Sequence, residues 1–340
     1  MLKVAIVGLG SIAPIHRHAI DHSKRAKLVC VCDSDSSKKA AYADIAFYTD
    51  IDLMLQQEKI DVVHNCLPHY LHHSVTELCA KNGVHVFTEK PVAICYKDAQ
   101  SLFDLESRYN IKIGVCLQNR YNETSIRAKQ LIQSGTYGTL HGAKGIVTWS
   151  RTMDYYNESA WRGIMSKSGG GVMINQTIHT IDLLQYIGGS FKNVKSMCAN
   201  ISLPQTQIED TVVAHFHYQN DATALFFGTI AYADNSSVEM EFILERAKIL
   251  IRDSKIYLSE DQGDFTLHGE DKKLSGSKHY YGASHMDAIE SFYSAILHNT
   301  HEYISVKEAA TSLKIIEAIC TSTETNTTQE IFGENEKSLS

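Results

Sequence analysis

The chain has 340 residues, 44% of them hydrophobic, so it can bury a large core and is long enough for two domains. It carries 32 Lys and Arg residues against 39 Asp and Glu residues, a formal net charge of -7, and neither sign forms a block. This composition argues against nucleic acid as a partner, and no apolar run approaches the length of a membrane span. The eight cysteines include no CxxC pair, and residues 1–10 lack the features of a signal peptide, so we expect a cytoplasmic protein with buried thiols.

The first 121 residues alternate short β-rich runs with helical patterns, which is typical of a parallel sheet with crossover helices. The runs are almost wholly apolar, as expected for strands covered on both faces. The predicted strands are residues 3–7, 27–32, 61–66, 84–88 and 112–117, and the clearest helical patterns are 71–82 and 96–109.

Beyond residue 121 the pattern changes, which predicts a second domain over 122–332 followed by a frayed tail over 333–340. Short polar turns such as Gln219-Asn220-Asp221 favour antiparallel neighbours. We therefore expect an α+β domain with a large, mostly antiparallel open sheet. Its predicted helices are 125–134, 171–187, 285–297 and 306–321, and its predicted strands are 139–149, 211–218, 222–231, 237–244 and 255–258.

The first predicted strand leads into Gly8-Leu9-Gly10-Ser11-Ile12-Ala13, a GxGxxA pattern that opens a helix with Pro14 in its first turn. Gly8 permits a tight turn, Gly10 lets backbone amides approach a pyrophosphate, and Ala13 allows close packing of the helix. The phosphates would then bind at the start of the helix, near Ser11 and Ile12. The pattern predicts a doubly wound Rossmann domain over residues 1–121 that binds a dinucleotide.

Asp33 follows the second predicted strand, close to the spacing at which a carboxylate binds the adenosine ribose hydroxyls. A carboxylate there repels a 2'-phosphate, which favours NAD. Ser34, Lys38 and Lys39 lie close enough in sequence to keep NADP open as a cofactor. A solvated loop aspartate is the other interpretation of Asp33.

Three further segments follow the same order as the motifs of one known family. They are Leu67-Pro68-His69-Tyr70-Leu71-His72, then Glu89-Lys90-Pro91, then Trp161-Arg162 with Gly169-Gly170-Gly171 and Asn175-Gln176-Thr177-Ile178-His179-Thr180-Ile181-Asp182. Together they resemble the glucose-fructose oxidoreductase, inositol dehydrogenase and MocA (Gfo/Idh/MocA) family. The resemblance implies an NAD(P)-dependent oxidoreductase that acts on CH–OH groups of sugars or polyols. It also implies that the cofactor is bordered by Leu67, Pro68, His72, Glu89 and Lys90.

Hydride transfer needs a group that takes the hydroxyl proton as the alkoxide develops. His179 is the candidate base, and Asn175 and Asp182 would share its face of a single helix. The resemblance places Lys90 beside the nicotinamide and the reacting hydroxyl, where its charge would stabilise the alkoxide. We expect Lys90 and His179 to converge there. Taken singly, Lys90 also fits a solvated loop lysine and His179 a hydrogen-bonded core histidine.

Asn175 departs from the pattern, because many polyol-oxidising relatives carry Asp at this position. Asparagine cannot act as an acid or a base, but it can position a hydroxyl. It also resembles branches of the family that act on sugar nucleotides, so the substrate stays open.

Four other residues are candidates for binding substrate together with Asn175 and His179. Trp161 and Arg162 would line the mouth of a cleft, although either could serve packing. Tyr155 could stack on a sugar face or lie in a surface loop, and Arg120 resembles an Arg-containing segment of the family. The 17 histidines and eight cysteines show no ligand spacing such as HExxH, so we predict no catalytic metal.

Two other functions stay open. One is an NAD-dependent glycosidase of the same superfamily, which oxidises the sugar transiently, and the other is a non-catalytic regulator that senses a dinucleotide. The family resemblance and the open sheet together imply a homodimer or homotetramer formed through the C-terminal sheet.

Overall fold

The computed structural model describes residues 1–159, 161–272 and 284–332, and the predicted tail at 333–340 lies outside this range. The chain divides into two compact units. Unit 1 comprises Met1–Gln118 and His285–Ala310, and unit 2 comprises Asn119–Ser284 and Thr311–Ser340. None of the described helices is both long enough and apolar enough to cross a membrane.

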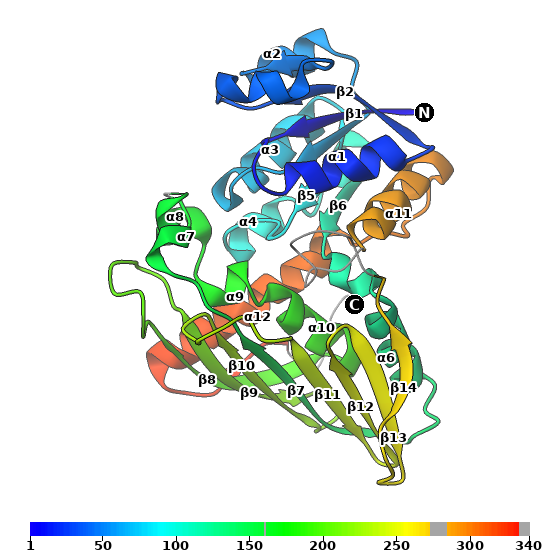
Figure 1. Ribbon diagram of the computed structural model, residues 1–340, viewed down its shortest axis with the longest axis vertical. Helices are drawn as coiled ribbons and strands as arrows, with labels where there is room; N and C mark the ends of the chain where they lie inside the picture. The colour runs from blue at the N-terminus through cyan, green and yellow to red at the C-terminus, as the bar shows by residue number, and fades with distance from the viewer. Residues whose placement is uncertain (160, 273–283, 333–340) are drawn as a thin grey trace. The chain divides into compact units, whose positions relative to one another are not determined.

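Unit 1 is built on a six-stranded parallel sheet with the order β3-β2-β1-β4-β5-β6 (Figure 1). All five predicted strands are present, and the short β3 was not predicted. The strands are β1 (Leu2–Val7), β2 (Ala26–Cys32), β3 (Ala46–Tyr48), β4 (Val62–Asn65), β5 (His85–Glu89) and β6 (Ile113–Cys116). Except in the edge strand β3, their residues are almost entirely buried, as expected for a parallel sheet covered on both faces.

The helices of unit 1 cross over between these strands. They are α1 (Ala13–His22), α2 (Ile51–Gln57), α3 (His69–Lys81), α4 (Tyr96–Ser101) and α5 (Leu105–Tyr109), with a 3-10 helix at Ser36–Tyr42. The helix predicted over 96–109 is thus two helices. Tight backbone hydrogen bonds from Leu102 to Ala99 and from Leu105 to Leu102 interrupt it.

Unit 1 also contains residues 285–310, so the prediction that all of 122–332 forms the second domain is wrong for this segment. Helix α11 (His285–His298) lies beside α1 and packs on β6 (Figure 1). The backbone N–H of Val115 donates to the carbonyl of Ile304 at 2.9 Å, which ties the following segment to β6. Such contacts join residues far apart in the chain, so no local pattern reveals them.

Strand β1 lies between β2 and β4, so the chain leaves β1 in one direction across the sheet and β4 in the other. In open α/β sheets, ligands bind at such a reversal, beyond the carboxyl ends of the strands. The predicted cofactor residues lie at or just beyond the ends of β1, β2, β4 and β5.

Unit 2 is built on a nine-stranded sheet with the order β14-β13-β12-β11-β7-β10-β9-β8-β15. Neighbouring strands are antiparallel except β7 and β10, which are parallel. The strands are β7 (Leu140–Thr148), β8 (Phe191–Ala199), β9 (Thr211–Tyr218), β10 (Thr223–Thr229), β11 (Glu239–Leu244), β12 (Ala247–Arg252), β13 (Lys255–Glu260), β14 (Thr266–Glu270) and β15 (Gln329–Glu330). The predicted mostly antiparallel sheet is therefore confirmed.

Helices α6 and α10 pack against one face of this sheet, α10 on β7 and β11 and α6 on β13 and β14. The helices of unit 2 are α6 (Glu123–Gln133), α7 (Met153–Asn157), α8 (Met165–Ser168), α9 (Val172–Asn175) and α10 (Ile178–Gly188). Helix α12 (Val306–Thr325) begins in unit 1 and ends in unit 2, and a 3-10 helix at Gln118–Tyr121 spans the boundary between them.

The strand register places exposed apolar side chains on the opposite face of the sheet, among polar ones such as His215, Lys144 and Glu241. Met197 pairs with Val213 across β8 and β9, and both are exposed, at 69% and 50%. Leu225 and Ile243 lie on the same face, also exposed. Within the described residues this face is open to solvent.

Candidate functional site

The glycine turn after β1 is shaped for a ligand. Gly8 has φ +88°, and a Cβ there would lie 2.8 Å from the Cys66 carbonyl carbon, so only glycine fits. At Gly10, in contrast, a Cβ would meet nothing within 4 Å. Helix α1 begins after Ile12 with no side-chain cap and with Pro14 in its first turn. An uncapped helix start beside open space suits the pyrophosphate of a dinucleotide.

Asp33 lies directly after β2 and is tied to the same turn. Its Oδ2 accepts hydrogen bonds from the Leu9 backbone N–H at 2.7 Å and from Lys38 Nζ at 2.8 Å, and its Oδ1 accepts from the Asp35 N–H at 2.9 Å. Burial opposes ionisation, but these three hydrogen bonds together lower the pKa of Asp33. The carboxylate is therefore ionised at neutral pH and holds the glycine turn, while Lys38 offsets part of its charge.

His72 joins the turns that follow β4 and β5. Its Nδ1 lies 2.6 Å from the Pro91 carbonyl oxygen and its Nε2 lies 2.7 Å from the Leu67 carbonyl oxygen. Burial lowers the pKa of His72, and the two carbonyls act in the opposite direction. Both ring nitrogens are engaged by the protein, so His72 shapes the two turns, and Pro68 begins helix α3 between them.

Glu89 is the last residue of β5, and Lys90 follows it at the carboxyl edge of the sheet. Oε2 of Glu89 accepts the Lys90 backbone N–H at 3.3 Å. Burial lowers the pKa of the Lys90 ammonium, while the Glu89 carboxylate raises it. Lys90 thus lies on the same edge of the unit 1 sheet as the glycine turn.

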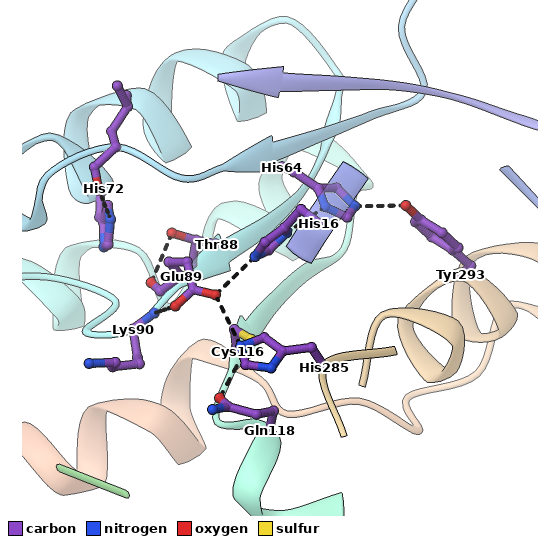
Figure 2. A network of polar contacts seen from close by, with 11 residues as sticks. His16, His64, His72, Thr88, Glu89, Lys90, Cys116, Gln118, His285 and Tyr293 are labelled. Carbon is purple, nitrogen blue, oxygen red and sulfur yellow. Dashed lines mark hydrogen bonds and ion pairs between the residues drawn. The ribbon is translucent and has the colours of Figure 1, made fainter. Parts of the chain in front are cut away.

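A buried polar cluster behind Lys90 was not predicted from the sequence (Figure 2). His16 Nε2 lies 2.9 Å from Glu89 Oε1, and the Cys116 thiol lies nearby, with the three ligand atoms within 4.8 Å of one another. The Cys116 thiol donates to Gln118 Oε1 at 3.7 Å, and burial and Glu89 raise the pKa of this thiol well above its usual value. A hydrogen-bonded cluster explains this arrangement better than a metal site.

In unit 2, the protein's own backbone occupies the space beside the last residue of the triple glycine at 169–171. A Cβ at Gly171 would lie 1.9 Å from the Glu209 carbonyl oxygen. The Glu209 carboxylate accepts the backbone N–H groups of Gly171 and Met173 at 2.9 and 3.0 Å. Glu209 therefore caps helix α9, a role that no local pattern indicated.

The single helix predicted over 171–187 is wrong, because it is broken between α9 and α10. Both the backbone N–H and the hydroxyl of Thr177 donate to the Val172 carbonyl, at 2.9 and 3.1 Å, which interrupts the helical hydrogen-bond pattern. Asn175 ends α9 and His179 lies in the first turn of α10. The prediction that Asn175 and His179 share one helical face is therefore also wrong.

Asp182, one turn after His179, is engaged by Arg120. Nε of Arg120 donates to Asp182 Oδ2 at 2.8 Å and its NH2 group donates to Oδ1 at 2.7 Å, and both side chains are buried. The Ser312 hydroxyl donates to the same carboxylate. This bidentate pair anchors α10, so Arg120 supports the helix that carries His179 and is not poised as a free ligand for substrate.

Three of the predicted substrate residues gather around Tyr155. The Arg162 guanidinium donates to the Tyr155 carbonyl at 2.8 Å and stacks 4.2 Å from the centre of its ring. The Tyr155 hydroxyl lies 3.4 Å from Asn175 Nδ2. Trp161 is further out, 5.9 Å from the Arg162 guanidinium carbon. Tyr155, Arg162 and Asn175 thus form one polar, aromatic group beside the end of α9.

Gln176, which follows Asn175, was not singled out from the sequence. Its side chain is 6% exposed, and its amide oxygen and nitrogen have no hydrogen-bond partner within the described part of the chain. Its position in the sequence, between the predicted catalytic residues Asn175 and His179, is the signal that could have identified it.

The chain matches a known family over both units. Residues 2–116 match an oxidoreductase family with an NAD-binding Rossmann fold, and residues 125–250 match the GFO/IDH/MocA C-terminal domain.

Individual relatives agree with these matches. The chain is 29% identical over 206 residues to the D-glucoside 3-dehydrogenase of Escherichia coli K12, which covers 58% of this chain and 57% of that protein. It is 22% identical over 281 residues to the myo-inositol 2-dehydrogenase of Thermotoga maritima, covering 77% and 80%. The chain thus spans little more than half the length of the first of these relatives.

Among solved structures, the chain resembles the WlbA dehydrogenase of Bordetella pertussis in complex with NADH and UDP-GlcNAcA. The TM-score is 0.84 at 23% identity, covering 97% of this chain and 98% of that one. At this identity the likeness shows the shared fold.

Proposed function

Because the chain belongs to the GFO/IDH/MocA oxidoreductase family, we propose that it is an NAD-dependent dehydrogenase that oxidises a hydroxyl-bearing carbon of a sugar, polyol or sugar derivative. The relatives support this substrate class, since two of them are named as a glucoside and an inositol dehydrogenase. The observation that carries the proposal is the position of Lys90 on the same edge of the unit 1 sheet as the open glycine turn.

Bound NAD would supply the hydride acceptor, held by the Gly8–Ile12 turn and by Asp33. The residues of unit 1 fit this group, because the protein leaves space at Gly10 and an uncapped helix start beside it. Lys90 would stabilise the alkoxide as the hydroxyl loses its proton.

In unit 2, His179 would accept the hydroxyl proton and return it in the reverse reaction. Arg120 and Asp182 fix the helix on which His179 lies. Tyr155, Arg162 and Asn175 would bind the substrate by stacking and by hydrogen bonds to its hydroxyls, and Trp161 would lie at their edge. An arginine in this group would also suit an acidic or nucleotide-bearing sugar.

A substrate screen tests the proposal. Sugars, inositols and nucleotide sugars are offered with NAD and with NADP, and the absorbance of the reduced cofactor is followed. We expect turnover with NAD that falls by about 10²- to 10⁴-fold in Lys90→Ala and in His179→Ala, while NAD affinity survives. Lys97→Ala and His141→Ala, which change exposed residues of the same types in the same units, serve as matched controls.

Two results would redirect the assignment. Release of an aglycone from a glycoside without net NADH would indicate the glycosidase, and NAD binding without turnover on any substrate would indicate the regulator. Near wild-type rates in both alanine variants would overturn the roles given to Lys90 and His179.

We also propose that the open face of the unit 2 sheet pairs with a second copy in a cytoplasmic homodimer or homotetramer. The exposed apolar side chains of Met197, Val213, Leu225 and Ile243 support this, because protein interfaces bury apolar groups together with polar ones. Light scattering should give a mass above that of one chain for the wild type and a lower mass for Leu225→Glu. A monomeric wild type would contradict the proposal.

A further inference from the structure

Behind Lys90 lies a chain of buried polar side chains that the proposed reaction does not use. It begins at Glu89, whose Oε1 lies 2.9 Å from His16 Nε2 and 4.0 Å from His285 Nε2 (Figure 2). An ionised carboxylate only accepts hydrogen bonds, so His16 Nε2 carries the proton of the shorter contact. The other oxygen of Glu89 accepts the Lys90 backbone N–H.

His16 is itself held from the opposite side. Its Nδ1 lies 2.8 Å from His64 Nδ1, and His64 Nε2 lies 2.7 Å from the Tyr293 hydroxyl. The side chains of His16, His64 and Tyr293 are fully buried and come from α1, β4 and α11. Because both of its nitrogens are engaged, His16 has one orientation, and that orientation aims Nε2 at Glu89.

The charges in this cluster are coupled to Lys90. Burial opposes the charge on Glu89, yet its hydrogen bond with His16 brings the pKa of Glu89 below its usual value. The titratable groups that interact with Glu89 are His16, His64, Cys66, His72, Lys90, Cys116 and His285. Glu89, Cys116 and His72 are among the groups of the described residues that interact with Lys90.

We propose that His16 is a positioning residue for Lys90 that acts through Glu89: it fixes the carboxylate that accepts the Lys90 backbone N–H and places a negative charge beside the Lys90 side chain. The inference rests on the proposed function for its catalytic meaning. The arrangement of the three residues stands independently of it, since all of the contacts lie within unit 1.

The test measures the titration of Lys90 directly in the full chain. Only a deprotonated amine reacts with acetic anhydride, so the pH dependence of Lys90 acetylation, followed by peptide mass spectrometry, gives its pKa. Loss of the carboxylate charge in Glu89→Gln should lower the midpoint by about one pH unit or more, because an adjacent opposite charge stabilises the ammonium. His16→Leu should lower it in the same direction.

A double variant separates action through Glu89 from an independent effect. If His16 works only through Glu89, the His16→Leu/Glu89→Gln midpoint equals that of Glu89→Gln alone. Additive shifts would overturn the proposal. His85→Gln is the matched control, since His85 lies at the other end of β5 and binds the Lys112 N–H, and its midpoint should not move.

His16→Gln covers the case in which His16→Leu does not fold, because its amide keeps a hydrogen-bond donor toward Glu89. We expect its Lys90 midpoint between those of the wild type and Glu89→Gln. The proposal is wrong if the Lys90 acetylation midpoint stays at the wild-type value in Glu89→Gln and also in the His16 variant that folds.

Steady-state kinetics then distinguish the proposed dehydrogenase function from the positioning role of His16. If Lys90 acts as an ammonium in turnover, the alkaline limb of kcat/KM moves to lower pH in Glu89→Gln by the same amount as the acetylation midpoint. A shifted midpoint without turnover on any substrate would refute the proposed function and leave the positioning role standing.

Discussion

The two glycine turns of this protein look alike in sequence and differ in what they hold. Both precede a helix, and each is tied by a carboxylate from elsewhere in the chain: Asp33 binds the Leu9 N–H and Glu209 binds the Gly171 N–H. At Gly10 the space beyond the backbone is open, whereas at Gly171 it is filled by the Glu209 carbonyl. One turn is shaped to receive a ligand, and the other is completed by the protein.

The two carboxylates also differ in their ionisation. Both are buried enough to oppose their charge, but Asp33 has Lys38 beside it and its pKa falls, whereas burial dominates at Glu209 and its pKa rises. The first glycine turn can stay open toward solvent and ligand, because Lys38 offsets the charge of its carboxylate. A turn closed on a buried carboxylate is part of the core.

The largest loss of stability is expected from adding a side chain at Gly171, where Glu209 already occupies the space. Gly171→Ala places a Cβ 1.9 Å from the Glu209 carbonyl oxygen, which is itself held by the Val172 N–H. The free energy of unfolding should fall by about 3 kcal/mol or more, as measured by urea denaturation. In Gly142→Ala the nearest atom is 3.7 Å away, so this control should lose far less. Equal losses would show that the clash is relieved.

The open turn should separate folding from binding. Gly10→Ala should leave the urea midpoint close to that of the wild type but weaken NAD at least tenfold, about 1.4 kcal/mol, because its methyl group occupies the space of the pyrophosphate. Gly8→Ala should reduce both, since φ +88° and the Cys66 backbone exclude a side chain. Unchanged NAD affinity in Gly10→Ala, measured by calorimetry, would argue against the pyrophosphate site.

The pH dependence of stability should distinguish the two carboxylates. The lowered pKa of Asp33 gives stability that is present above the unfolded pKa, near 4, and is lost as pH falls through the folded value. The raised pKa of Glu209 works in the opposite sense, so its contribution is greatest below about pH 4 and is lost as pH rises through the folded value.

Thermal midpoints of the wild type, Asp33→Asn and Glu209→Gln between pH 3 and pH 8 test this contrast. Asp33→Asn should cost about 1–2 kcal/mol at pH 7 and less at pH 3, and the cost of Glu209→Gln should be smallest at pH 7. Parallel curves for the two variants would be the contrary result.

The smallest effect concerns the ion pair that compensates Asp33. Lys38 is partly exposed, so Lys38→Met should lower the free energy of unfolding by less than about 1 kcal/mol, and the difference should shrink in 1 M salt. A salt-independent loss of more than this, measured by urea denaturation, would mean that Lys38 has a further structural role.

Much of the fold followed from local patterns. The five predicted strands of unit 1 and the five predicted strands of unit 2 are present because runs of β-branched residues and short polar turns depend on near neighbours. Five of the described strands were not predicted: β3, β8, β12, β14 and β15. Of these, β3 and β15 are only three and two residues long. The break between α9 and α10 escaped because Thr177 competes for a backbone carbonyl that an uninterrupted helix would use.

The candidate site also has residues that local patterns identified and contacts that they did not. The roles of Gly8, Asp33 and Lys90 as parts of one sheet edge followed from motif spacing, and the structure places all three at the carboxyl ends of unit 1 strands. The partner of Arg120, in contrast, is Asp182, which lies 62 residues away, and no pattern within either segment names the other.

By itself, the sequence determined most of the strands and helices and the position of the dinucleotide-type turn, because both depend on residues close to each other in the chain. Tertiary structure alone decided that Glu209 closes the second glycine turn, 38 residues from Gly171, and that His16 reaches Glu89 across 73 residues. The physical reason is that a buried polar group must find a partner wherever the folded chain brings one within hydrogen-bonding distance, and sequence separation does not limit that choice.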